Sequence, residues 1–300
     1  MPAYITHAIS AEDLYFDAQE DIALFKVGMS LKELKTYALG VDLALPAKSF
    51  NAHNQHTQAF FLNLIKYVKD NKLYLDSHVL AFLYGHILHY FLDINVHPFV
   101  FYLEKGCQKV GLIKPHNLVE GYISSYLCQK ILKTDITYVD ESYFNRANIA
   151  DKEIAKMINT VYKATYGADN VSETYRETLN AFIFLEKITK NPLISKDMLI
   201  KMSGFKKFLT ENNLLVEELI NEFKETYLNP VTGSKHSESF IELYALAIEM
   251  TLDAIFKVNQ YLYGNASLDS LKSVFTDLSY DTGVPCEMGK KFNYVKQIRR

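Results

Sequence analysis

The segment LYGHILHYFLDINVHPF, residues 83–99, places three histidines and an aspartate within an otherwise apolar stretch. His89 and Asp93 are four residues apart and His86 falls three before His89, so on a helix these side chains share one face. His97 follows one turn later. Buried imidazole and carboxylate groups are costly unless hydrogen bonds or a metal ion satisfy them. The segment therefore indicates either a hydrogen-bonded polar cluster or a metal site.

A second pair with the same spacing occurs in PHNLVEGY, where His116 and Glu120 project from one face of a helix that begins at Pro115. Imidazole nitrogen and carboxylate oxygen are typical zinc donors. One such pair alone is more typical of a buried histidine bonded to a neighbouring acid. Two pairs within 32 residues, with His97 between them, favour a metal site.

The elements that carry these residues are predicted to be helices. Only 12 glycines and 7 prolines interrupt 300 residues, and Asn-Gly and Asp-Gly hairpin signals are absent from the sequence. Ser10 and Asp13 resemble a capping box that opens a first helix over residues 11–26. The pattern predicts further helices near residues 56–70, 76–96, 115–132, 150–166, 173–189, 195–211, 213–227, 236–261 and 267–278. The predicted fold class is all-α.

The histidines are distributed unevenly along the chain. Eight of the nine lie within the first 120 residues. The length suits one large domain or two closely packed ones. We therefore expect a single all-helical domain over residues 1–300, with the metal ligands in residues 1–132 and helical support in residues 133–300.

The composition argues against several classes of protein. A net charge of −3 and a pI near 6.3 provide no strong nucleic-acid signal. Three cysteines without paired spacing argue against a disulfide framework and a thiolate zinc site. No apolar run reaches the roughly 18 residues needed for a transmembrane segment, and no signal peptide is evident. We expect a cytoplasmic protein.

The order of the polar residues resembles that of the zinc-dependent phospholipases C of bacteria, in particular short relatives with Thr-His near the N-terminus. The matching positions are His7 in YITH, Asp42 in ALGVDLALP, His56 in NAHNQHTQAFF, His89 and Asp93 in LHYFLD, His97 in NVHPF, and His116 and Glu120 in PHNLVE. The resemblance implies an all-helical fold that holds two or three zinc ions. His53 competes with His56, and we favour His56 because it begins the helix TQAFFLNLIKYV.

The resemblance also implies roles for these residues. One zinc ion would bind Asp42, His56, His89 and Asp93, and a second would bind His97, His116 and Glu120. Asp93 would bridge to a third ion near His7. The implied activity is hydrolysis of a phosphodiester such as a phospholipid, with Asp42 as the catalytic residue that helps to deprotonate water. Among the other histidines, His78 and His86 are expected to be structural or to support a ligand, and His236 to lie in a surface loop.

Two alternatives stay open at this level. The zinc-dependent single-strand nucleases use a similar site, so the substrate could be a nucleotide or a nucleic acid. The chain could also be a metal-binding helical protein without turnover. The second alternative is favoured by the absence of tryptophan, because secreted members of the family use an N-terminal tryptophan as a ligand.

Overall fold

The computed structural model describes residues 3–21, 28–45, 50–109, 114–133, 151–189 and 205–297. Its helices are α1 (Ala3–Asp21), α2 (Leu31–Tyr37), η2 (Gly40–Ala44), α3 (Thr57–Asp70), η3 (Leu73–Leu75), α4 (Ser77–Gly106), α5 (Pro115–Leu127), η4 (Cys128–Leu132), α6 (Lys152–Tyr166), α7 (Val171–Thr189), α9 (Phe205–Glu211), η8 (Glu217–Ile220), α10 (Phe240–Leu262), η9 (Leu268–Ser273) and η10 (Cys286–Met288). Two short strands, β1 (Tyr227–Leu228) and β2 (Lys235–His236), form an antiparallel pair. The predicted all-α class is confirmed.

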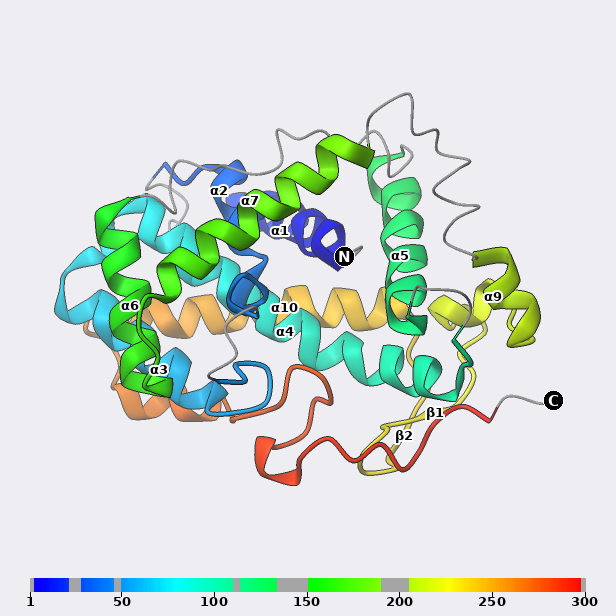
Figure 1. Cartoon of the computed structure of the whole chain (residues 1–300). Coiled ribbons are helices and arrows are strands. Elements are labelled where there is room, and N and C mark those ends of the chain that lie inside the picture. Colours follow the sequence, from blue (N-terminus) through cyan, green and yellow to red (C-terminus); the bar gives the residue numbers. More distant parts are fainter. Residues whose placement is uncertain are drawn as a thin grey trace.

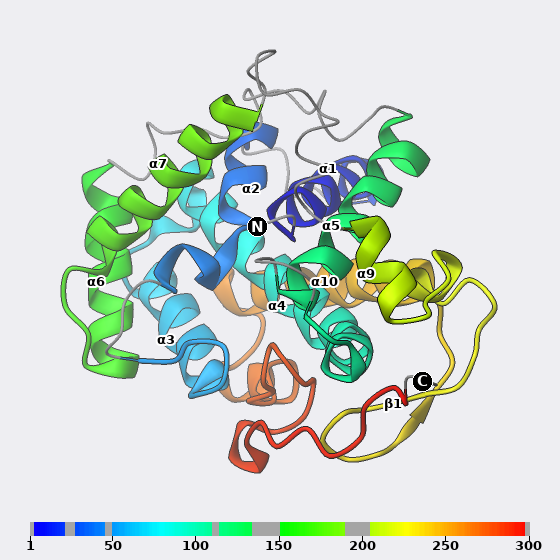
Figure 2. The ribbon, with the colours of Figure 1, turned by 45° about the vertical axis from the view of Figure 1, so that its right-hand side comes forward.

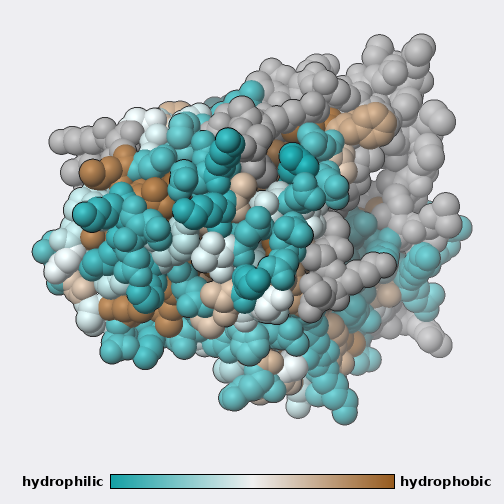
Figure 3. Space-filling view, turned by 60° about the vertical axis from the view of Figure 1, so that its left-hand side comes forward, coloured by the Kyte–Doolittle hydropathy of each residue, from teal (hydrophilic) through white to brown (hydrophobic). Residues whose placement is uncertain are grey.

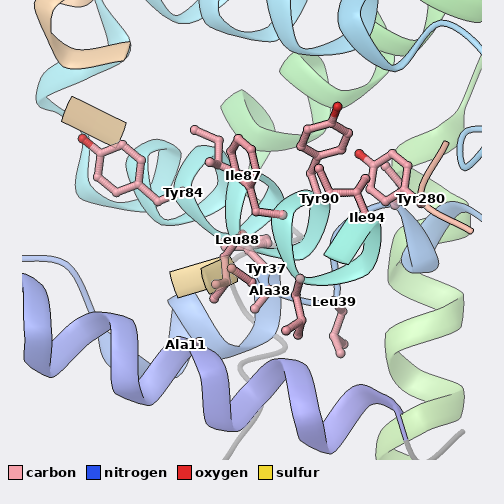
Figure 4. Packing of buried hydrophobic residues seen from close by; sticks show 14 of the residues in the cluster. Ala11, Tyr37, Ala38, Leu39, Tyr84, Ile87, Leu88, Tyr90, Ile94 and Tyr280 are labelled. Atoms are coloured by element: carbon pink, nitrogen blue, oxygen red, sulfur yellow. The ribbon is translucent and has the colours of Figure 1, made fainter. Parts of the chain in front are cut away.

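Helix α4 forms the centre of the molecule. Helix α10 runs along it, and α1, α2, α3 and α5 also contact it (Figures 1 and 2). Figure 4 shows residues 37–39 and Ala11 packed on one side of α4, and Tyr280 packed beside Tyr90 on another. On the face seen in Figure 3, hydrophobic residues are interspersed with hydrophilic ones. The buried hydrophobic side chains of the described residues form one cluster that includes residues along α4.

By length and composition, α4 is the one helix in the described ranges that could cross a membrane. The sequence-based expectation of no transmembrane segment rested on the polar residues that interrupt this stretch, which a test by length and average composition passes over. However, 94% of the most apolar stretch of α4 is buried inside the protein. The core helix of a globular protein has the same character, because it is apolar on every side.

Helix α4 begins at a capped end and continues further than the sequence indicates. The Asp76 side chain accepts hydrogen bonds from the backbone N–H groups of His78 and Val79, at 2.9 and 3.4 Å. We predicted an end near residue 96, but the helix passes through Pro98 to Gly106. A proline removes one helical hydrogen bond, and tight burial of the surrounding turns offsets that loss here.

The expected capping box at the first helix is wrong. Helix α1 begins at Ala3, so Ser10 and Asp13 lie inside it. The Ser10 hydroxyl donates to the His7 carbonyl oxygen at 2.8 Å, and the Asp13 carboxylate accepts a hydrogen bond from Tyr244 at 2.6 Å. The apolar side chains before Ser10 pack into the core, which extends the helix toward its N-terminus and brings His7 onto it.

Two helices predicted in the C-terminal half are also wrong. Residues 213–227 form only η8 and the start of β1, and residues 267–278 form only η9. Asn213, Asn221 and Asp277 adopt positive φ angles of 47°, 49° and 53°. Asn and Asp tolerate this left-handed conformation, which a helix cannot continue through. Of the predicted helix 195–211, the part before residue 205 lies outside the described residues.

Candidate metal centre

Asp93 is the central residue of the polar cluster. Its Oδ1 atom lies 3.3 Å from Nε2 of His7 on α1, and its Oδ2 atom lies 3.3 Å from Nε2 of His89. The Nδ1 atom of His97 is 3.6 Å from the same Oδ2. His89, Asp93 and His97 follow one another at intervals of four residues, so successive turns of α4 place them on one side of the helix. The resulting carboxylate is almost completely buried, with 3% of its side chain exposed.

A first candidate metal-binding group consists of His7, His89 and Asp93. Their ligand atoms lie within 4.8 Å of one another. The imidazole rings of His7 and His89 have centroids 4.3 Å apart. All three residues are buried, so α1 and α4 form this group at their contact.

A second group joins Asp42, His53 and His89. Asp42 Oδ1 lies 3.0 Å from His53 Nε2. Gly40, at φ 52°, allows η2 to approach α4, because a Cβ atom there would lie 2.3 Å from Cγ of His89. Nδ1 of His89 faces the Ala38 carbonyl oxygen at 3.1 Å. Only Nε2 of His89 is therefore free to serve as a ligand, and the first two groups share it.

The third group consists of His97, His116 and Glu120. Oε1 of Glu120 lies 3.0 Å from His116 Nε2 and 3.3 Å from His97 Nε2. Pro115 occupies the first turn of α5, as predicted, and this start places His116 and Glu120 on one face. The His116 side chain is 25% exposed, so this group reaches the surface.

The donor atoms of this cluster suit a divalent cation. Among the buried side-chain atoms of the described residues that have no hydrogen-bond partner are Nε2 of His53, Nε2 of His89 and Oδ2 of Asp93. They lie 3.0 to 3.3 Å from opposing polar atoms without hydrogen-bond geometry. An unsatisfied buried polar atom costs about 1–3 kcal/mol. Nitrogen and oxygen donors that converge in this way fit zinc, which satisfies all of them together.

The electrostatics of the cluster follow from its burial and its acids. Burial disfavours the charged form of His53, but the adjacent carboxylates of Asp281 and Asp42 outweigh it and raise the pKa of His53 to about 10. In the same way, burial is outweighed by the charges of Asp93 and Glu120, which raise the pKa of His97 to about 10. Burial, together with neighbouring imidazoles, lowers the pKa of His89. A metal ion that bound at His53 or His97 would therefore displace a proton.

The structure does not bring His56 into the cluster. It is exposed, precedes α3 at φ 55°, and its ring lies 6.3 Å from that of Tyr166. His53 stands beside Asp42 instead, which reverses our sequence-based preference. The spacing from Asp42 allows either histidine, and the turn that separates them decides which one points inward.

The remaining histidines have other partners. His86 Nδ1 lies 2.8 Å from the Phe82 carbonyl oxygen, and Nε2 lies 2.9 Å from the Tyr175 hydroxyl. Both of its nitrogens are thus occupied within the core. His78 pairs with Glu33 at 2.9 Å. His236 lies on β2, away from the three groups.

Sequence reasoning missed two residues that contact the cluster, Tyr280 and Asp281. The Tyr280 ring stacks on His53 with centroids 5.1 Å apart, and its carbonyl oxygen lies 3.0 Å from Nδ1 of His97. Oδ1 of Asp281 lies 3.5 Å from Nδ1 of His53. The local sequence SYDTGVP reads only as a turn, so nothing in it relates these residues to histidines far away in the chain.

The fold and the cluster define an all-helical protein with three adjacent groups of candidate metal ligands. The family model for zinc dependent phospholipase C matches residues 1–188. The chain belongs to this family, which is zinc-dependent, and the three groups all lie within the matched residues. No curated protein and no solved structure matches the chain.

Proposed function

We propose that the protein is a zinc-dependent phosphodiesterase that cleaves a phospholipid between the phosphate and the glycerol oxygen. The observation that carries this proposal is the convergence of three ligand groups within the residues matched to the family. A single buried histidine and acid would be explained by core packing. Three linked groups whose buried nitrogen and oxygen atoms have no hydrogen-bond partner fit a cluster of two or three metal ions better than they fit core packing.

The ligands divide among the ions according to the groups. His97, His116 and Glu120 would hold one ion, and Asp42 with His53 would hold another. His7, His89 and Asp93 complete the set, and His89 belongs to both of the first two groups. When bound, zinc lowers the pKa of water and neutralises negative charge on the phosphate.

Asp42 is the residue that we propose as proton acceptor. Its side chain is 22% exposed, compared with 3% for Asp93 and 9% for Glu120. Burial alone would raise the pKa of Asp42, but the adjacent imidazole of His53 and the charges of the other nearby imidazoles lower it. Asp42 is therefore ionised at neutral pH and accessible to a reacting water molecule.

The cavity inside the cluster suits an ion better than a substrate. It lies between α1, α4 and α5 and has a volume of about 20 Å³. Such a volume holds about one water molecule. A phosphodiester would therefore approach from outside, where Asp42 and His116 are the most exposed members of the three groups.

The test is metal analysis followed by a substrate screen. We expect two or three zinc ions per chain and hydrolysis of a nitrophenyl phosphocholine, which a chelator abolishes. Asp42→Asn at saturating zinc should lower turnover by about 100- to 10,000-fold, whereas His236→Ala should leave it unchanged. A fully metallated protein that cleaves no phosphodiester would refute the proposal in favour of the non-catalytic alternative. Cleavage of single-stranded nucleic acid alone would identify a nuclease.

A further inference from the structure

The loop of residues 277–286 lies outside the residues matched to the family but is seated against the centre of α4. An isolated bridge between Leu278 and Pro285 closes it. Gly283, at φ 64°, faces the backbone of α4, because a Cβ atom there would lie 2.4 Å from the Ile94 carbonyl oxygen. That carbonyl is the one to which Pro98 cannot donate a hydrogen bond. The loop thus lies against the turn of α4 that lacks this hydrogen bond, next to His97.

Tyr280 connects this loop to two of the three ligand groups. Its backbone N–H donates to the His53 carbonyl oxygen at 2.8 Å, and its ring lies nearly parallel to the His53 imidazole, at 15°. Its own carbonyl oxygen lies 3.0 Å from Nδ1 of His97. One residue therefore holds a histidine of the second group and a histidine of the third.

The Asp281 carboxylate is oriented by groups on its far side. Oδ2 accepts a hydrogen bond from Nδ2 of Asn54 at 2.8 Å and pairs with the Lys290 ammonium group. The Ser279 hydroxyl donates to Oδ1 of Asn54 at 2.7 Å, which fixes the amide so that its nitrogen faces Asp281. Two donors thus occupy Oδ2, and Oδ1 is left facing His53. The Asp281 side chain is only 8% exposed.

We propose that Asp281 is a positioning residue for the metal centre, which keeps the proton of His53 on Nδ1 and directs Nε2 toward Asp42. A metal-bound histidine commonly donates its second N–H to a carboxylate, which fixes its tautomer and ring orientation. This inference rests on the proposed function in one respect, namely that His53 binds zinc.

Zinc affinity measured by chelator competition tests the inference. Removing such a partner lowers metal affinity about 10- to 100-fold, and we expect that loss for Asp281→Ala, with full zinc content at saturation. Asp281→Asn should lose at least as much. Asn54 and Lys290 would attract the new amide oxygen, leaving the amide N–H₂ to face His53. Nδ1 of His53 would then have to accept, which moves the proton to Nε2 and blocks coordination.

Comparing the zinc affinities of Asp281→Ala and Asp281→Asn distinguishes a positioning role from simple packing. A residue that only fills space would tolerate Asn, which has the same shape, better than Ala. Asp277→Asn is the matched control, because Asp277 lies in the same loop but contacts Thr57 and Gln58 rather than a histidine. We expect this control to change thermal stability without changing zinc affinity.

Each outcome has a distinct meaning. Unchanged zinc affinity in Asp281→Ala, or a loss in Asp277→Asn as large as in Asp281→Asn, would overturn the inference. Zinc binding without phosphodiester hydrolysis in the wild type would overturn only the proposed function. A wild-type protein that binds no zinc would overturn both.

Discussion

Gly40→Ala is the substitution that most directly tests how η2 and α4 meet at the cluster. Gly40 has φ 52°, and a Cβ atom there would lie 2.3 Å from Cγ of His89 and 2.5 Å from Cδ2. The His89 ring is completely buried and its Nδ1 atom faces the Ala38 carbonyl oxygen. The ring cannot move without breaking that contact, so the backbone of η2 or the imidazole must shift.

The expected loss in the free energy of unfolding of Gly40→Ala has two parts. A non-glycine residue in the left-handed conformation costs about 1–2 kcal/mol, and forcing a methyl group into a packed core costs about 1–3 kcal/mol more. Gly40→Ala should therefore lower the free energy of unfolding by about 2–5 kcal/mol. Gly167→Ala supplies the control, because Gly167 has φ 68° with nothing within 4 Å of its added Cβ. Gly167→Ala should lose only the cost of the left-handed conformation, about 1–2 kcal/mol.

Urea denaturation with a chelator present measures both variants without contributions from metal. Zinc titration of the folded proteins then shows whether His89 has moved. We expect Gly40→Ala to bind zinc more weakly than Gly167→Ala, which should match the wild type. Equal destabilisation of the two variants, together with wild-type zinc affinity in Gly40→Ala, would refute the close approach of η2 to His89.

Two further predictions follow from the histidines. His53→Ala should empty one zinc position while His56→Ala leaves the zinc content unchanged, as measured by elemental analysis; the opposite result would assign the ligand to His56. Burial lowers the pKa of His86 to about 3, so between pH 6.5 and 3 the unfolded chain binds a proton that the folded chain does not, and stability falls as the pH falls. Urea denaturation of the metal-free protein at pH 7 and pH 5 measures this loss. From pH 7 to pH 5 the free energy of unfolding should fall by about 2 kcal/mol less in His86→Gln than in the wild type. An equal fall in the two proteins would contradict a neutral, buried His86.

Much of the fold was predictable because helical periodicity and sparse glycine and proline are local signals. The errors occur where tertiary contacts override local preference. The predicted end of α4 near residue 96 relied on Pro98, but burial of the turns before and after Pro98 carries the helix to Gly106. The prediction of one domain over residues 1–300 stays a prediction.

The candidate site was predictable only in part, for the same physical reason. The pairs His89–Asp93 and His116–Glu120 are visible because helical spacing brings residues four apart together. The choice between His53 and His56 depends on a turn whose direction no local pattern records. Asp281 lies more than 220 positions from His53 in the chain, and only the folded structure shows their contact.

The buried polar groups of α4 are explained by what surrounds them. Each histidine of the cluster on α4 has one nitrogen directed at a backbone oxygen, His89 at Ala38 and His97 at Tyr280, and the other directed toward an acid. His86, on the same helix, has both nitrogens occupied by neutral groups of the core. This difference separates a structural histidine from a candidate ligand, because a ligand needs one nitrogen held in place and the other left for the metal.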